Sequence, residues 1–428
     1  MIDNEIFLIR SESGYILYAP LARFSARINN DCAEAVLRKQ RGKAALPEEK
    51  AIIEYLSSFG IFNKAEPPVK KRLKPTEVTL FPSDGCSLKC VYCYADCGGT
   101  KHIMPLNTGK AAIDLVFNNA LEQNVSPVAV KFHGNGEPFT AFDTVKELSR
   151  YAREKSEKTG VPVTLIAVSN GYWSDDILSW VTDEIDETAI SFDGIKSVQN
   201  AQRPTVSGKE SFSVVDRTLR ELNRRRKAFG IKVTVTAKSV DSIVDTARYV
   251  SEAYPECGWL QFEPVWNVGR FSGAEDGETY FDRFINGYIQ ADRQFGGRLR
   301  LMYATANINE LRLSGCGVPD GQFVVTPQGL VTSCYEVYDR GDTRSDVYIY
   351  GKYNGINGFC FDADKLDLLR RYTVSNMPYC KDCYCKYHCA GDCPAKLLST
   401  NNPQSFKGSD RCKVTRAITK YLIEKQLS

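Results

Sequence analysis

Residues 78–93, VTLFPSDGCSLKCVYC, join a short β-branched strand to a loop that carries three cysteines. The strand ends at Phe81, and Cys86, Cys90 and Cys93 follow it with spacings of three and two residues. Ligands collect at the carboxyl ends of the strands in parallel α/β sheets. The stretch therefore predicts a thiolate-rich ligand site at the start of an α/β domain.

The pattern that begins at residue 76 is a regular alternation of strands and amphipathic helices. We predict strands at 78–81, 128–132, 163–168, 188–192, 231–237 and 259–263. Between them we predict helices at 112–121, 145–152, 177–181, 214–222 and 243–250. Six β-then-α units in succession specify a parallel sheet with helical crossovers, either an open doubly wound sheet or a whole or partial barrel.

The N-terminal residues have a different pattern. Apolar runs at 6–9 and 15–18 enclose a turn and predict a β-hairpin, while Asn30 or Asp31 and Pro47 are suited to start helices. This is a small winged-helix-like unit. Pro-rich, basic residues follow it and are typical of an extended linker. The predicted domain boundaries are 1–66, 67–75 (linker), 76–300 and 301–428.

Composition narrows the class of protein. The 428 residues include 55 basic and 52 acidic side chains, and this balance predicts neither a nucleic-acid nor a membrane partner. The chain has no run of about 18 apolar residues and no secretory signal, so we expect a cytoplasmic protein. Fifteen cysteines in a reducing compartment indicate metal ligands rather than disulfides, and only three histidines accompany them.

The cysteine triplet after the first strand resembles that of the radical S-adenosylmethionine (AdoMet) superfamily. The resemblance implies a 4Fe-4S cluster held by Cys86, Cys90 and Cys93, with AdoMet bound at the free iron and cleaved by one electron. Thiolate-ligated clusters reach the low potentials that this reduction requires. Tyr92 occupies the place of the aromatic residue that shields the cluster in the family. The alternative is a tetrahedral zinc site with Cys97 as the fourth ligand.

Polar residues after the later strands match the same family. Gly134-Asn135-Gly136-Glu137 resembles the segment that receives the AdoMet amino group, although Asn135 departs from the commoner double glycine. By resemblance, Ser191 and Arg203 contact the ribose and carboxylate, and Glu263 approaches the adenine. The full set of candidate cofactor contacts is Tyr92, Gly134, Asn135, Gly136, Glu137, Ser169, Ser191, Asp193, Arg203 and Glu263. For His133, the sequence is equally consistent with a packing role in the second strand and with a functional role.

The C-terminal cysteines resemble the seven-cysteine pattern of the SPASM extension. By position, Cys316, Cys334 and Cys393 would hold a first auxiliary 4Fe-4S cluster. A second would be held by Cys380, Cys383, Cys389 and Cys412. The first set lacks one ligand, which Cys360 would supply unless that iron stays open. Cys97 and Cys385 fall outside the patterns. Without the resemblance, one or two zinc ribbons are the alternative.

Together the resemblances imply an α/β enzyme with a partial (β/α)6 barrel, three 4Fe-4S clusters and AdoMet. Its expected partners are a precursor peptide with a leader segment and a reducing protein such as flavodoxin or ferredoxin. The expected reaction forms a thioether or carbon-carbon cross-link in a ribosomally made peptide. Alternatives are sulfatase maturation by formylglycine formation, peptide epimerisation, and a non-catalytic electron carrier or zinc-stabilised peptide-binding module. For the N-terminal unit, the alternative interpretation is a winged-helix domain that binds DNA.

Overall fold

The computed structural model describes residues 2–3, 5–65, 74–97, 102–271, 277–356, 358–397 and 402–428. It divides into two compact units, one made of Arg72–Tyr303 and Cys316–Tyr372. The other combines Met1–Lys71, Ala304–Gly315 and Thr373–Ser428. Most of the expected linker, 67–75, lies outside the described residues, so the domain boundaries remain a prediction.

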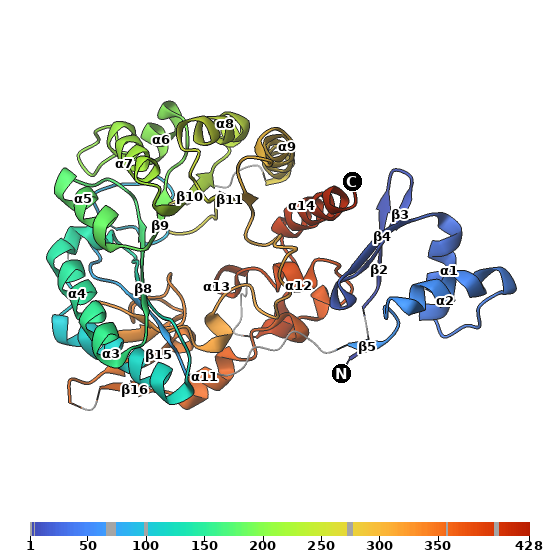
Figure 1. The fold of residues 1–428 in the computed structure, drawn as a ribbon, viewed down its shortest axis with the longest axis horizontal. Coiled ribbons are helices and arrows are strands. Elements are labelled where there is room, and N and C mark those ends of the chain that lie inside the picture. Colours follow the sequence, from blue (N-terminus) through green and yellow to red (C-terminus); the bar gives the residue numbers. More distant parts are fainter. Residues whose placement is uncertain are drawn as a thin grey trace. The chain divides into compact units, whose positions relative to one another are not determined.

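The larger unit is built on a mostly parallel sheet (Figure 1). Its parallel strands are β6 (Glu77–Leu80), β7 (Val128–Phe132), β8 (Val163–Ser169), β9 (Glu187–Ser191), β10 (Ala228–Val235), β11 (Trp259–Pro264) and β12 (Leu301–Met302). They lie side by side in chain order. The six predicted strands are confirmed to within about three residues, and the α/β class with a large parallel sheet is confirmed with them.

Helices connect these strands and follow one side of the sheet in Figure 1. They are α3 (Leu106–Gln123), α4 (Phe142–Thr159), α5 (Asp175–Glu184), α6 (Lys196–Gln202), α7 (Phe212–Arg224), α8 (Ile243–Ala253) and α9 (Gly277–Phe295). The five predicted helices are confirmed, each as part of a longer element. Ser174 caps α5, because its side chain accepts a hydrogen bond from the Ile177 backbone N–H, 3.4 Å away.

A second group of strands extends the same sheet beyond β6. These are β13 (Val324–Val325), β14 (Leu330–Thr332), β15 (Ile349–Tyr353) and β16 (Phe359–Phe361), accompanied by α10 (Ser345–Tyr348) and α11 (Ala363–Leu369). The predicted hairpin is confirmed as the antiparallel β13–β14 pair. The sequence did not predict that β13 pairs with β6 in parallel, which makes the hairpin part of the main sheet.

The smaller unit contains an antiparallel three-stranded sheet, in the order β2-β3-β4. Its elements are β2 (Phe7–Ser11), β3 (Gly14–Ala19), β4 (Phe24–Ile28), α1 (Asn30–Gln40) and α2 (Lys50–Ser58), beside a two-stranded pair of β1 (Ile2–Asp3) and β5 (Lys64–Ala65). The hairpin is confirmed. The predicted cap at Asn30 or Asp31 was wrong by one residue, because the extended Asn29 accepts the Cys32 N–H at 2.9 Å.

C-terminal residues complete this unit with α12 (Lys386–Cys389), α13 (Pro394–Leu397) and α14 (Arg411–Gln426). Ile9, Ile16 and Tyr18 of the small sheet pack in one apolar cluster with Ile423 of α14. The N-terminal sheet and the last helix therefore share a core. Among all described helices, none is long and apolar enough to cross a bilayer.

Candidate active site

The three cysteines after β6 lie close together in one loop. Burial raises the pKa of Cys86 to about 12, and the charges of Cys90 and Cys93 contribute to that rise. The pKa of Cys93 is lowered to about 5, chiefly by a hydrogen bond from the Cys97 thiol. The loop is held against residues 202–204 by backbone hydrogen bonds of 2.7 and 2.9 Å. The local fold therefore gathers the thiols that the sequence singled out.

The donor set suits a cluster that binds each cysteine at a different iron. N–H groups approach two of the sulfurs: Arg203 Nη1 lies 3.8 Å from Cys90 Sγ, and Asn170 Nδ2 lies 3.7 Å from Cys86 Sγ. Such contacts stabilise thiolates and tune a cluster's potential. Within the described residues, no three His, Cys, Asp or Glu side chains converge as ligands of a single metal ion. A 4Fe-4S cluster does not require convergence on one point, so the triplet fits it.

The segment after β7 packs directly on the cysteine loop. A Cβ atom on Gly136 would lie 2.4 Å from the Gly85 carbonyl oxygen, so only glycine allows this approach. The Cys97 sulfur also lies against the Asn135 backbone carbonyl. The side-chain Oδ1 of Asn135 is buried and accepts no hydrogen bond from any described residue. A buried, unoccupied acceptor beside the cysteines suits the ammonium group of an amino-acid ligand.

Glu137 is a buried carboxylate that joins the ends of two strands. Its Oε1 accepts a hydrogen bond from Ser169 Oγ at 2.7 Å, and its Oε2 accepts one from the Asn170 backbone N–H at 2.8 Å. Burial raises the pKa of Glu137 to about 6, against these hydrogen bonds. The Ser169 hydroxyl also accepts from Trp173 Nε1 at 2.9 Å. The polar side-chain atoms of Glu137 and Ser169, both predicted cofactor contacts, are thus used in hydrogen bonds that join the segment after β7 to the end of β8.

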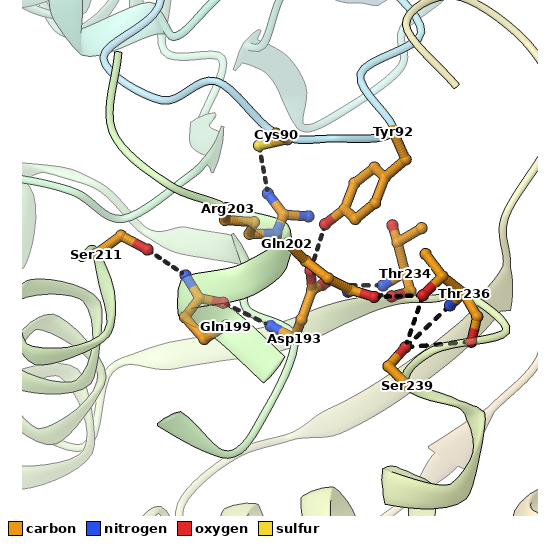
Figure 2. Close-up of polar contacts among 10 residues, drawn as sticks. All are labelled: Cys90, Tyr92, Asp193, Gln199, Gln202, Arg203, Ser211, Thr234, Thr236 and Ser239. Carbon is orange, nitrogen blue, oxygen red and sulfur yellow. Dashed lines mark hydrogen bonds and ion pairs between the residues drawn. The ribbon is translucent and has the colours of Figure 1, made fainter. Parts of the chain in front are cut away.

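Asp193 is the centre of a second buried network (Figure 2). Its Oδ2 accepts hydrogen bonds from the Tyr92 hydroxyl at 2.5 Å and from Gln202 Nε2 at 2.7 Å. Arg203 Nε lies 3.1 Å from the same oxygen, and its guanidinium lies over the Tyr92 ring at 5.2 Å. The network therefore fixes Tyr92 and Arg203 next to Cys90, as Figure 2 shows.

Two further predicted contacts lie on neighbouring strands of the same sheet. Ser191 ends β9, in register with Lys232 of β10. Glu263 lies in β11, where its Oε1 accepts a hydrogen bond from Gln261 Nε2 at 2.9 Å. Their roles as ribose and adenine contacts remain predictions.

Three residues near the cysteines were missed as site residues. Asn170 reaches Cys86, and Gln202 holds Asp193. Arg270 binds the loop most extensively, because its Nη1 and Nη2 each donate to a backbone carbonyl, those of Cys90 and Cys97, at 2.8 Å. A lone arginine in a loop carries no sequence signal for this contact, whereas Asn170 follows the flagged Ser169 directly and could have been named.

The C-terminal region brings four predicted ligands together within the smaller unit. Burial is the largest of the effects that raise the pKa of Cys389. The charges of Cys412, Cys380 and Cys383 raise it further. The four thiols are therefore close neighbours, as one cluster requires. Cys385 also lies there and donates to Cys383, whose pKa is lowered to about 6 mainly by that hydrogen bond.

The other predicted auxiliary ligands are divided between the two units. Cys316 and Cys334 lie in the larger unit, where burial and, to a smaller extent, the charge of Cys316 raise the pKa of Cys334 to about 12. Cys393 belongs to the smaller unit. Cys360 is exposed in β16, and its sulfur accepts a hydrogen bond from Asn354 Nδ2 at 3.2 Å. The first auxiliary ligand set remains a prediction.

Comparison with known proteins bears on the whole arrangement. No family model matches the sequence. The chain is 25% identical over 308 residues to a cysteine-type anaerobic sulfatase-maturating enzyme of Clostridium perfringens, covering 64% of this chain and 76% of that protein. This match and the cysteine pattern support the radical AdoMet superfamily in its SPASM-bearing type. The chain is an enzyme.

Solved structures of other proteins have the same fold as this chain. anSMEcpe with bound AdoMet superposes with a TM-score of 0.67 at 19% identity, covering 82% of this chain and 94% of that chain. Streptococcus suis SuiB bound to its precursor peptide SuiA superposes with a TM-score of 0.53 at 14% identity, covering 96% and 99%. The second likeness extends over nearly the full length of the enzyme.

Proposed function

We propose that this enzyme reductively cleaves AdoMet and abstracts a hydrogen from a residue of a ribosomally synthesised precursor peptide. The product would be a thioether or carbon-carbon cross-link. The observation that carries the proposal is that one chain combines the three-thiol loop with a small N-terminal sheet whose β4 edge has no strand partner among the described residues. We further propose that the parallel strands β6 to β11 form a partial barrel around the site.

The residues around the cysteine loop support binding of the cluster and AdoMet. In this proposal Cys86, Cys90 and Cys93 hold a 4Fe-4S cluster, which supplies the electron that cleaves the sulfonium. Asn135 Oδ1 is a buried acceptor suited to the AdoMet ammonium. Arg203, fixed by Asp193, keeps a positive charge beside the Cys90 sulfur. Such a charge favours the thiolate over the thiol.

A leader peptide would bind along the β4 edge. Extended peptides add to exposed sheet edges through backbone hydrogen bonds, with pockets for alternate side chains. Next to β4, the Phe24 ring packs 4.9 Å from that of Phe59, which contacts Tyr55 at 5.1 Å. Tyr55 and Phe59 are 66% and 44% exposed. These aromatic side chains supply the apolar surface that such a groove needs.

The C-terminal thiols would hold two auxiliary clusters. Cys380, Cys383, Cys389 and Cys412 form the second ligand set, supported by their electrostatic proximity. The proposed first set is Cys316, Cys334 and Cys393, with Cys360 as a possible fourth. Closing a thioether ring releases one proton and one electron in addition to the abstracted hydrogen atom, and an auxiliary cluster can accept that electron. Flavodoxin or ferredoxin would reduce the AdoMet-binding cluster.

The decisive test is AdoMet cleavage by anaerobically reconstituted, reduced enzyme. We expect 5'-deoxyadenosine from the wild type and none from Cys90→Ala. Cys97→Ala should keep its iron and its cleavage activity, because Cys97 lies outside the triplet. Cleavage by Cys90→Ala, or tightly bound zinc in place of iron and sulfide, would refute the assignment.

Leader binding is better tested by point variants than by truncation. Removing residues 1–66 would expose the apolar surface of Ile423, which packs against Ile9 and Ile16. Tyr55→Ala removes an exposed ring and should weaken binding of a fluorescent precursor peptide about tenfold, since aromatic anchors dominate such contacts. Leu37→Ala on α1 is a matched exposed control and should bind normally. Equal affinity of wild type and Tyr55→Ala would remove the groove from the proposal.

Formylglycine formation is the second candidate function, because the 308-residue similarity is to a sulfatase-maturating enzyme. The two functions differ in the product. Cross-linking leaves the peptide lighter by two hydrogens with every sulfur retained, whereas oxidation of a cysteine to formylglycine removes sulfur. Mass spectrometry of a cysteine-containing sulfatase peptide and of a precursor peptide, each incubated with the enzyme, separates the two.

A further inference from the structure

The sheet face opposite the helices carries several partly exposed polar side chains, together with Ile166 and Val168 of β8. Along β7, β8, β10 and β11, buried residues alternate with partly exposed ones. The buried positions are apolar except for Ser169 and face the connecting helices, as the period of two requires. The alternate positions include Lys131 in β7 and His133 directly after it, Lys232 in β10, and Gln261 and Glu263 in β11. We call this surface the inner face.

Lys232 contributes an amine to this face. Within the described residues, no hydrogen bond or ion pair reaches its Nζ. Its register neighbours are Ser191 in β9 and Gln261 in β11. Lys131, by contrast, is paired with Glu77, whose Oε1 lies 2.6 Å from Nζ. The inner face therefore holds one neutralised lysine and one whose three N–H donors are unused.

His133 presents a second unused donor to the same face. Its Nδ1 accepts the Gly134 backbone N–H at 2.6 Å, so the neutral ring carries its proton on Nε2. The ring stacks on Tyr335 with centroids 4.7 Å apart and planes 1° from parallel, which fixes its direction. No described residue bonds to Nε2. Its hydrogen is therefore available to an incoming acceptor.

The electrostatic field on this face favours an anion. The pKa of His133 is lowered to about 3, first by burial and then by the positive charges of Lys232 and Lys131. The pKa of Lys232 is also lowered, by burial and by the charge of Lys131. Glu263 opposes that effect only in part. A bound negative charge would relieve this repulsion.

We propose that Lys232 and His133 form a subsite on the inner face that binds a carboxylate of the peptide substrate, an aspartate or glutamate side chain. The subsite rests on the proposed function, since it names the class of residue presented to the site. The Lys232 ammonium and the His133 Nε2–H can each donate to a carboxylate oxygen, and the two side chains interact electrostatically. Hydrogen bonds between charged groups are about twice as strong as neutral ones, so the subsite discriminates glutamate from glutamine.

The test compares two capped amino acids, N-acetylglutamate amide and N-acetylglutamine amide, bound to full-length, reconstituted enzyme saturated with AdoMet. Ligand-observed NMR gives both affinities. The wild type should prefer the glutamate compound by about tenfold, as one charge-assisted hydrogen bond predicts. Lys232→Met should abolish the preference, and Lys232→Arg should keep it. Lys238→Met, at an exposed site just beyond the same strand, is the matched control and should behave as the wild type.

A second variant guards against a folding defect. His133→Phe keeps the stack on Tyr335 without the donor and should reduce the preference about threefold, the effect of one neutral hydrogen bond. Equal wild-type affinity for both compounds, or a preference retained in Lys232→Met, overturns the subsite. Weaker AdoMet binding by Lys232→Met with peptide preference intact also overturns it, because the carboxylate would then be the cofactor's. AdoMet cleavage is measured separately, so failure of the subsite is distinct from failure of the proposed function.

Discussion

Arg203 and Asp193 form an ion pair in which Nε lies 3.1 Å from Oδ2, with side chains only 8% and 0% exposed. The carboxylate also accepts hydrogen bonds from Tyr92 and Gln202. Each charge is balanced by the other inside the protein. The ion pair also places the guanidinium beside the Cys90 sulfur. The pair thus links the end of β9 to the cysteine loop.

Asp193→Asn should lower the free energy of unfolding strongly. The substitution leaves the Arg203 charge buried without its partner, and breaking a buried pair in this way costs roughly 3–5 kcal/mol. Denaturant unfolding measures the loss. Asp241→Asn is the control, because its carboxylate pairs with Arg283 at the surface and its loss should change little. Equal losses in both variants would contradict a special role for the buried pair.

Gly136→Ala should reduce cluster loading. The added methyl would lie 2.4 Å from the Gly85 carbonyl oxygen, so the cysteine loop must move away from the β7 segment. Overpacking of this kind costs about 1–3 kcal/mol. Iron and sulfide per chain, measured after reconstitution, should fall. Gly297→Ala, where a methyl meets no atom within 4 Å, should load as the wild type does.

Glu137→Gln should alter the pH dependence of stability. Burial raises the pKa of Glu137 to about 6, so the folded protein binds this proton more tightly than the unfolded chain does. The stability contribution is present below the unfolded pKa of about 4.3 and is lost as pH rises through 6, opposite to the usual carboxylate. The difference in unfolding free energy between wild type and variant should shift by about 2 kcal/mol between pH 4 and 7. A difference independent of pH would show that the carboxyl titrates normally.

Tyr18→Phe should destabilise the smaller unit. His388 Nδ1 lies 3.0 Å from the Asn307 carbonyl oxygen and donates to it, so Nε2 accepts the Tyr18 hydroxyl proton. Burial lowers the pKa of His388 and keeps it neutral. Without the hydroxyl, a buried acceptor stays unpaired at a cost of about 1–3 kcal/mol. Thermal unfolding should show the loss, and Tyr15→Phe on the same strand serves as the control. Equal melting of both variants would exclude the bond as a contributor.

Local patterns were sufficient to predict most of the larger unit. The alternation of apolar strands and amphipathic helices predicted all six central strands, because the period of apolar residues within each segment indicates its type and its buried face. The hairpin at β13 and β14 was equally local. Its parallel pairing with β6 was not predictable, since an edge contact between residues 79 and 324 leaves no periodic signal in either segment.

The candidate site was predictable to a similar degree. Cysteine spacing and its resemblance to a known family predicted which thiols would hold clusters. Spacing did not indicate that Ser169 and Glu137 bind each other, nor that Arg270 clamps the cysteine loop. Those contacts depend on side chains brought together from distant strands and loops.

The amino-acid order alone determined which residues form strands and helices and that three cysteines share the loop after β6, because both depend on short-range periodicity and spacing. Only the tertiary structure decided that Asp193 binds Arg203, that Lys232 faces the inner side of the sheet without a partner among the described residues, and that the N-terminal sheet shares a core with α14. These outcomes follow from which groups are buried together, and burial sets the strength of every charge and hydrogen bond involved.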